Sequence, residues 1–136
     1  VQLITALTKL ASAYSNTTSA KISVISNSAV GGAYVMLAGK GNNADYVFAF
    51  ENSVICPMPV DSAVAFMYGD RLANGEDRAA LVRGYKDNNA SAANALNSGV
   101  VDKVITKDNA RYEIVKVINM LINKRETTIP RKHTVK

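Results

Sequence analysis

Two adjacent glycines, Gly31 and Gly32, lie where a strand-like run ends and an apolar, helix-like run begins, in the stretch SAVGGAYVMLAGKG (28–41). Glycine at such a junction permits two elements to pack closely. It also permits chemistry, because backbone N–H groups at a strand-to-helix turn can be directed at a negatively charged oxygen. The residue types leave both interpretations open. The second requires no acidic or basic side chain in the turn, and the turn contains none.

Other residues that could carry chemistry lack the partners that catalysis needs. Cys56 lies in a Val/Ile run beside two prolines and has no histidine near it in the sequence, so we expect a buried, inert thiol. His133 falls in a polar, basic tail, where we expect it to be exposed to solvent. One histidine and one cysteine leave no metal site of the usual His/Cys kind.

The acidic residues of the middle segment show no spacing that would pair two carboxylates on one predicted face. We expect them to cap helices or to lie in solvated loops. These residues are Asp61, Asp70, Glu76 and Asp77.

The length of 136 residues is enough for one domain with a core, and 48% hydrophobic with 20% charged residues is ordinary for a globular protein. The net charge of +5 comes mainly from the segment 124–136, which has five basic residues and one acidic residue. The preceding segment has 11 basic and 10 acidic residues. A basic tail without interleaved aromatic residues is weak evidence for nucleic-acid binding. We therefore expect no nucleic-acid partner, and a tail that is solvated or docked on a partner.

The cellular context is constrained by three features. A single cysteine excludes an internal disulfide and fits a reducing cytoplasm. No run approaches the roughly 18 apolar residues of a membrane helix, and no signal sequence opens the chain. Val1 begins an apolar helical pattern, which we interpret as the start of a fragment or domain of a longer protein.

The elements that would position the glycine turn alternate between strands and helices. Runs rich in β-branched and aromatic residues predict strands near 21–27, 45–51, 53–57 and 100–105. Apolar residues at helical spacing predict helices near 3–15, 33–39, 60–68 and 109–123, with shorter candidates at 77–86 and just before Gly99. The class is therefore α/β with parallel pairing. Because the chain opens on a helix, we expect the sheet to lack strands that belong upstream.

The order of these pieces resembles the carboxyltransferase subunits of biotin-dependent acyl-CoA carboxylases and their decarboxylase relatives, which belong to the crotonase-like superfamily. The most specific motifs are GGAY (Gly31–Tyr34) after a Val/Ile/Ser strand, GxVDxVI (Gly99–Ile105) and PRKH (Pro130–His133). The resemblance runs over nearly the whole chain. It departs after His133, where an xNIPL-like ending is usual in the family and TVK stands here.

The resemblance implies a fold and a site. It implies a crotonase-like ββα spiral, with 1–123 as the C-terminal half-domain and 124–136 as a basic tail. In the family the glycine turn is an oxyanion hole, which places the backbone donors at Gly32 and Ala33. Gly31, Tyr34 and Val35 would bind substrate, with Val35 shaping a small acyl pocket or simply packing in the helix.

The resemblance also implies partners. Biotin would be carried on a partner domain or subunit, and the acyl-CoA substrate would lie against an N-terminal carboxyltransferase half from another subunit. Biotin carboxyl carrier and biotin carboxylase components, and a homo-oligomer, follow from the same family pattern. We therefore expect the isolated chain to be catalytically silent and to self-associate.

Several alternatives stay open at this point. The parent could act as a biotin-dependent acyl-CoA decarboxylase, or the chain could be a non-catalytic assembly module. A crotonase-like hydratase or isomerase would need a carboxylate near the second glycine turn, and none stands there. A Clp-type serine peptidase would need a serine, histidine and acid together, which His133 cannot complete from the tail. The acyl-CoA, and the direction of the reaction, are not determined by the sequence.

Overall fold

Two small parallel sheets form the centre of the structure. The computed structural model describes residues 2–37 and 39–124. Within them, one sheet has the order β1-β3-β5 and the other pairs β2 with β4, with all neighbouring strands parallel. The strands are β1 (Ile22–Ile25), β2 (Ser28–Val30), β3 (Tyr46–Phe50), β4 (Val54–Cys56) and β5 (Lys103–Ile105).

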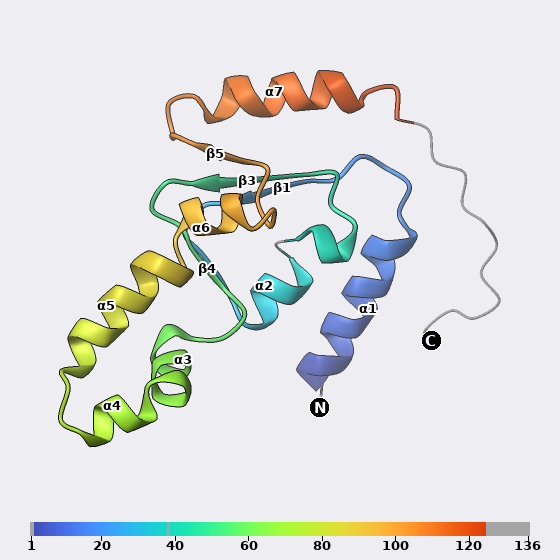
Figure 1. Ribbon diagram of the computed structural model, residues 1–136. Helices are drawn as coiled ribbons and strands as arrows, with labels where there is room; N and C mark the ends of the chain where they lie inside the picture. Colours follow the sequence, from blue (N-terminus) through green and yellow to red (C-terminus); the bar gives the residue numbers. More distant parts are fainter. Residues whose placement is uncertain (1, 38, 125–136) are drawn as a thin grey trace.

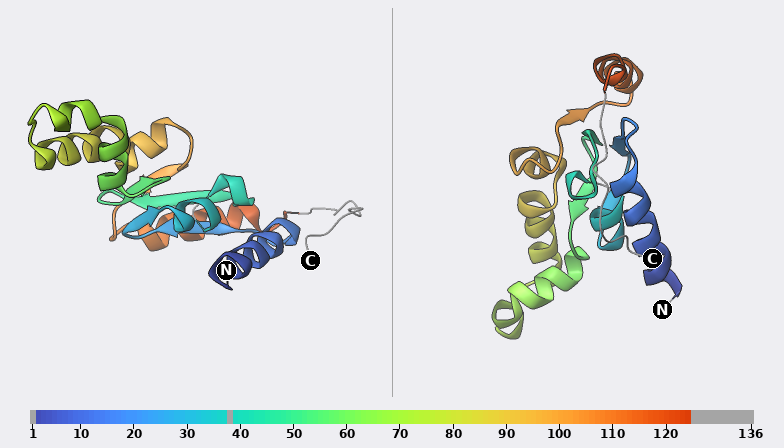
Figure 2. Two further views of the ribbon diagram at one scale, coloured as in Figure 1. Left: turned by 90° about the horizontal axis from the view of Figure 1, so that it is seen from below. Right: turned by 90° about the vertical axis from the view of Figure 1, so that its right-hand side faces the viewer.

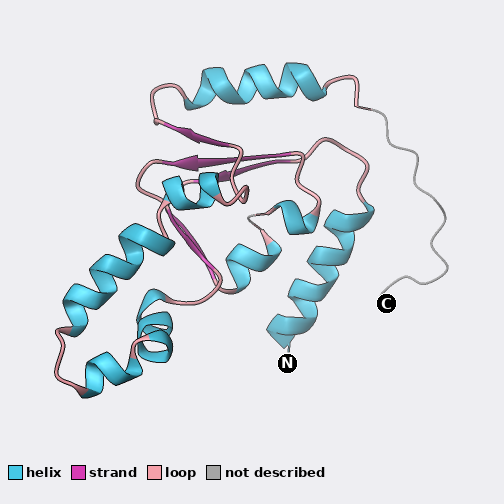
Figure 3. Cartoon of the chain, in the orientation of Figure 1, coloured by secondary structure: helices cyan, strands magenta, loops and turns pink. Residues whose placement is uncertain are grey.

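The chain passes twice in the same way from the larger sheet into the smaller one. β1 leads into β2, and β3 leads into β4, each through a short bend. The bends are tied together because the Ser53 hydroxyl donates to the carbonyl of Ile25 at 2.9 Å, and the Val54 N–H donates to the carbonyl of Asn27 at 2.9 Å. A helix follows each pair of strands, which gives two successive strand–strand–helix units (Figures 1 and 3).

Seven α-helices and one short 3-10 helix surround the sheets within the described residues. They are α1 (Gln2–Asn16), α2 (Gly32–Met36), η1 (Lys40–Asn42), α3 (Val60–Met67), α4 (Gly69–Ala73), α5 (Arg78–Asn89), α6 (Ala92–Asn97) and α7 (Ala110–Leu121). In the part of the chain that the structure describes, no helix combines the length and the apolar character needed to cross a membrane.

The central strand β3 is covered on both faces, which makes it the most buried of the described strands. Val47 points into a core cluster that α6 completes with Ala92 and Ala95. Phe48 points into a second cluster, which α7 completes with Val117. Figure 1 shows α7 running along the three-stranded sheet. Burial on both faces explains why β3 reads as a continuous apolar run.

Two parts at the margins of the molecule expose large apolar side chains. α1 contains no buried residue, and the apolar side chains of Leu3, Leu10 and Tyr14 on this helix are accessible. The hairpin of α3, α4 and α5 projects from the opposite end of the sheet (Figure 2). Its outer surface includes Phe66, whose side chain is 85% exposed. These exposed apolar side chains are surfaces on which another part of an assembly could pack.

The structure agrees with the predicted elements in type and corrects several boundaries. The single strand expected at 21–27 is β1, which ends at Ile25; a separate strand, β2, begins at Ser28 and was not predicted. The tied bends described above end β1 and redirect the chain into the second sheet. The strand expected at 100–105 begins only at Lys103, because the N–H groups of Val100 and Val101 both donate to the carbonyl of Ala95 and close α6.

The helix predictions also needed correction at their ends. The helix expected at 33–39 is the shorter α2, and the one expected at 109–123 is α7 (Ala110–Leu121). α4 and η1 were not predicted. β1 lies at an edge of its sheet, and the side chain of its residue Val24 is exposed.

Candidate functional site

The glycine turn forms a sharp junction between β2 and α2. Gly31 has φ 60° and ψ −122°, a conformation that only glycine adopts without strain, whereas Gly32 is not in the positive-φ region. The N–H of Gly31 donates to the carbonyl of Cys56 at 3.3 Å, which fixes the turn to the end of β4. The backbone reversal therefore explains the glycine at position 31 and leaves the glycine at position 32 without a conformational reason.

Close packing does not explain Gly32 either. A Cβ atom added there would meet only the Leu7 side chain, at 3.7 Å, which is an ordinary van der Waals distance. A Cβ on Gly31 would meet nothing within 4 Å. Gly32 is exposed, so the space beside this residue opens to solvent.

The start of α2 presents backbone donors at this open turn. The first N–H groups of an α-helix have no partner within the helix. In α2 the N–H of Val35 is the one that reaches back to the carbonyl of Gly31, at 3.1 Å, so Gly32 and Ala33 precede the first intrahelical bond. No side chain caps this helix start. The turn can thus offer two neighbouring N–H groups to an anionic oxygen from outside.

The two other predicted site residues of the turn face different surroundings. Tyr34 packs against the core cluster that contains Val47, so its ring anchors α2 to the sheet. Val35 is 54% exposed and lies on the outer side of α2. The structure therefore brings Gly31, Gly32 and Val35 to one accessible edge, whereas Tyr34 points inward.

The remaining candidates occupy structural positions. Cys56 is buried, its thiol lies 3.0 Å from the carbonyl of Met58, and burial raises the pKa of the thiol, so the expectation of a buried cysteine is confirmed. Asp77 caps α5 by accepting from the N–H groups of Ala79 and Ala80. His133 lies outside the described residues. Among the described residues, no cluster of potential metal ligands is present.

Two half-buried carboxylates bind the three-stranded sheet and the segment that precedes β1. Asp102, the acid of the GxVDxVI motif, accepts from the N–H of Val47 at 2.8 Å and pairs with Lys40 at 2.5 Å. Asp45 pairs with Lys124 and accepts from the N–H of Lys21 at 2.7 Å. Burial raises the pKa of Asp45, but the hydrogen bonds from Lys124 and Lys21 outweigh this and hold the pKa below its ordinary value. Lys124, the first residue of the predicted tail, is thereby held against the domain.

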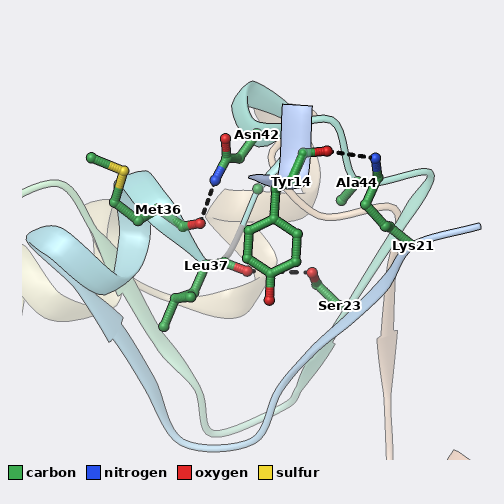
Figure 4. Close-up of a pocket in the computed structure, with 8 residues that line it drawn as sticks. Tyr14, Lys21, Ser23, Met36, Leu37, Asn42 and Ala44 are labelled. Atoms are coloured by element: carbon green, nitrogen blue, oxygen red, sulfur yellow. Dashed lines mark hydrogen bonds between the residues drawn. The ribbon is translucent and has the colours of Figure 1, made fainter. Parts of the chain in front are cut away.

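A small pocket lies at the other end of α2, and none of its residues is predicted as a site residue from the sequence. It measures about 20 Å³ and lies between α1, β1, α2 and η1 (Figure 4). Two of its residues bind the final carbonyl groups of α2. The Asn42 amide donates to the carbonyl of Met36 at 2.6 Å, and the Ser23 hydroxyl donates to that of Leu37 at 3.3 Å. No sequence pattern relates these residues to the glycine turn.

The family of the chain follows from comparison with known proteins. A family model described as the carboxyl transferase domain matches residues 2–136. The chain belongs to the carboxyl transferase domain family. The predicted membership is thereby confirmed.

The curated relatives that this chain matches are much longer than the chain itself. It is 34% identical over 129 residues to the methylmalonyl-CoA decarboxylase subunit alpha of Propionigenium modestum, covering 92% of this chain and 25% of the relative. It is 35% identical over 133 residues to the biotin-dependent acetyl-/propionyl-coenzyme A carboxylase beta5 subunit of Mycobacterium tuberculosis, covering 92% of this chain and 24% of that one. The chain thus spans about a quarter of the length of the relatives it matches.

Solved structures confirm the fold class. The crystal structure of the transcarboxylase 12S hexamer, with methylmalonyl-coenzyme A bound, superimposes with a TM-score of 0.88 at 28% identity, over 97% of this chain and 26% of that one. The geranyl-CoA carboxylase beta subunit of P. aeruginosa shares the fold with a TM-score of 0.71 at 16% identity. The predicted α/β, crotonase-like architecture, present in part, is therefore confirmed.

Proposed function

We propose that this chain is the C-terminal half of a carboxyltransferase that transfers CO₂ between carboxybiotin and an acyl-CoA, and that the N–H groups of Gly32 and Ala33 form its oxyanion hole. The observation that carries the proposal is the uncapped start of α2 at an exposed turn. In a chain of this family, such a turn places two fixed donors where a negatively charged oxygen can approach.

The turn fits a biotin ring on grounds of space and chemistry. Gly31 and Gly32 leave the approach free of side chains, and the exposed, apolar Val35 adjoins it. When bound, carboxybiotin supplies the CO₂, and negative charge remains on its ureido oxygen. The amides of Gly32 and Ala33 stabilise that charge without reorganising, because the turn is held by the bond from Gly31 to Cys56 and by the packing of Tyr34.

The substrate-binding roles divide according to exposure. Gly31 sets the backbone direction, and Val35 contributes apolar surface beside the acyl group. Tyr34 acts from the core side by keeping α2 in place. The acyl-CoA enolate would be held mainly by the other half of the enzyme, for which this chain provides the facing surface.

The proposed partners follow from the incompleteness of the pocket. The chain would work with an N-terminal carboxyltransferase half, a biotin carboxyl carrier and a biotin carboxylase, within a homo-oligomer in the cytoplasm. The relatives of about four times its length support this, as do the accessible apolar side chains of α1 and α3. The same donors would serve a biotin-dependent decarboxylase, whose alpha subunit is also among the relatives.

The test is a set of parallel measurements on Gly32→Val in the complete enzyme that contains this chain. The added methyl groups crowd the two donors, so we expect the biotin-dependent rate to fall by about 10²-fold or more. The acyl-CoA affinity should stay near the original value, because the acyl-CoA binds mainly to the other half. The melting temperature should shift only slightly, because a Cβ at this position meets Leu7 at an ordinary distance.

A matched control separates chemistry from backbone effects. Gly84→Val introduces the same side chain within α5, where a Cβ would meet nothing within 4 Å. This variant should retain both its stability and its rate, because the added side chain meets open space and valine is a better helix former than glycine. If Gly32→Val remains stable and fully active, the oxyanion hole is not at this turn. If rate, affinity and stability of Gly32→Val fall together, the turn is structural.

A further inference from the structure

α2 is too short to fix its own direction. It has five residues, and the bonds at its two ends run from the N–H of Val35 to the carbonyl of Gly31 and from the N–H of Leu37 to the carbonyl of Ala33. An isolated helix of this length is not stable in water, because the free-energy cost of nucleating it exceeds the stabilisation from so few hydrogen bonds. The direction of its N–H groups must therefore be set by contacts with the rest of the molecule.

Two side chains hold the far end of α2. The last carbonyl groups of a helix have no partner within it. Asn42 donates to the carbonyl of Met36 at 2.6 Å, and Ser23 donates to that of Leu37 at 3.3 Å. Figure 4 shows both bonds converging on the end of α2 from different elements. Both donors are half-buried.

Both donors are themselves tied to the three-stranded sheet. Ser23 belongs to β1, where it pairs with Val47 of the buried strand β3. Asn42 belongs to η1, which Lys40 joins to Asp102 through an ion pair of 2.5 Å. Asp102 in turn accepts from the N–H of Val47 at 2.8 Å. The two restraints on α2 therefore lead to the same residue, Val47, of the most buried strand.

We propose that Ser23 and Asn42 are positioning residues, which hold the end of α2 against the sheet and thereby fix the N–H groups of Gly32 and Ala33 at its start. This inference rests on the proposed function of that turn. Positioning matters because a displacement of reacting groups by about 1 Å can cost about 10²-fold in rate. Neither residue touches the turn itself, so each acts through α2.

The first readout needs no ligand. In the complete subunit, Asn42→Ala removes the amide that binds Met36, and Ser23→Ala removes the hydroxyl that binds Leu37. Hydrogen exchange of the peptide that contains α2, followed by mass spectrometry, should become about tenfold faster in each variant. Ser23→Thr keeps the hydroxyl and should restore the original exchange rate.

The second readout is the split between kcat and KM. Both alanine variants should lower kcat of the biotin-dependent transfer by about tenfold to 10²-fold, with the KM for acyl-CoA unchanged. Asn94→Ala is the matched control, because the Asn94 amide donates at 3.1 Å to the carbonyl of Asn89, the last residue of α5. This variant should change neither exchange in α2 nor kcat.

The outcomes separate this inference from the function on which it rests. Unchanged exchange in both alanine variants overturns the positioning role, even if Gly32→Val abolishes transfer. Faster exchange with unchanged kcat also overturns it, because α2 would then move without consequence. If Gly32→Val is fully active as well, the proposed function itself fails, and the positioning role fails with it.

Discussion

Two helices of this molecule begin shortly after a glycine with positive φ, and they treat their first N–H groups in opposite ways. α5 follows Gly75 (φ 85°) and is capped by Asp77, which accepts from Ala79 at 3.0 Å and from Ala80 at 3.3 Å. α2 follows Gly31 (φ 60°) and has no side-chain cap. A capped start satisfies its own donors, whereas an uncapped one leaves them for another acceptor.

The difference extends to what surrounds each start. α5 has twelve residues and belongs to a hairpin at the margin of the molecule. α2 has five and lies against the sheet, with its far end restrained by Ser23 and Asn42. The chain thus supplies a side-chain cap for α5, which has only to be stable. It supplies external restraints where the N–H groups are proposed to bind an oxyanion.

The largest expected effect is the complete loss of transfer in the isolated chain. The purified 136-residue chain should show no malonyl-CoA decarboxylation and no transfer from carboxybiotin, because the proposed pocket needs an N-terminal half. Sedimentation should show self-association, since apolar side chains such as Phe66 and Ile4 are exposed. Measurable turnover by this chain, or a monomer at high concentration, would contradict the proposed division of the pocket.

A cap introduced at α2 should convert its start into one that resembles that of α5. In the complete enzyme, Gly31→Asp places a carboxylate beside the N–H groups of Gly32 and Ala33, where it competes with and repels an anionic oxygen. We expect the transfer rate to fall by about 10²- to 10³-fold. Gly31→Asn imposes the same backbone strain without the charge and should lose less. Equal rates in the two variants would argue against an oxyanion at this turn.

The sheet beneath α2 should respond to acid in a defined direction. The pKa of Asp45 is held below its ordinary value of 3.8 in the folded state. Its stabilising contribution is therefore fully present above that value and is lost as the pH falls through the lower, folded pKa. Asp45→Asn should cost about 1–3 kcal/mol at neutral pH. Denaturant unfolding at pH 7 and at pH 3 measures the difference in free energy of unfolding between Asp45→Asn and the parent. This difference should be smaller at pH 3. A larger difference at pH 3 would contradict the expected direction of the pH effect.

The smallest effect concerns the cap of α5. Asp77→Ala removes the acceptor of two N–H groups and should lower the free energy of unfolding by about 1 kcal/mol. The transfer rate should stay unchanged, because α5 belongs to the segment of α3, α4 and α5 at the margin of the molecule. Chemical denaturation measures the free energy of unfolding, and an assay on the same sample measures the transfer rate. A loss of rate comparable to that of Gly31→Asp would remove the distinction between the two helix starts.

The sequence predicted the parts of this structure that depend on local pattern. The apolar run of β3, the glycines before α2 and the motif order sufficed for the fold class and the family. The bend at Asn27 escaped prediction, because it depends on Ser53 and Val54, which are distant in the sequence. Ser23 and Asn42 escaped for the same reason, since each binds a carbonyl that only the folded chain brings near.

The central claim is tested most directly by the structure of the complete enzyme with biotin bound. We predict that the backbone nitrogens of Gly32 and Ala33 both lie about 2.7–3.1 Å from the ureido oxygen, with Gly31 keeping its positive φ. A ureido oxygen that binds donors from another element, with the start of α2 facing solvent, would contradict the account.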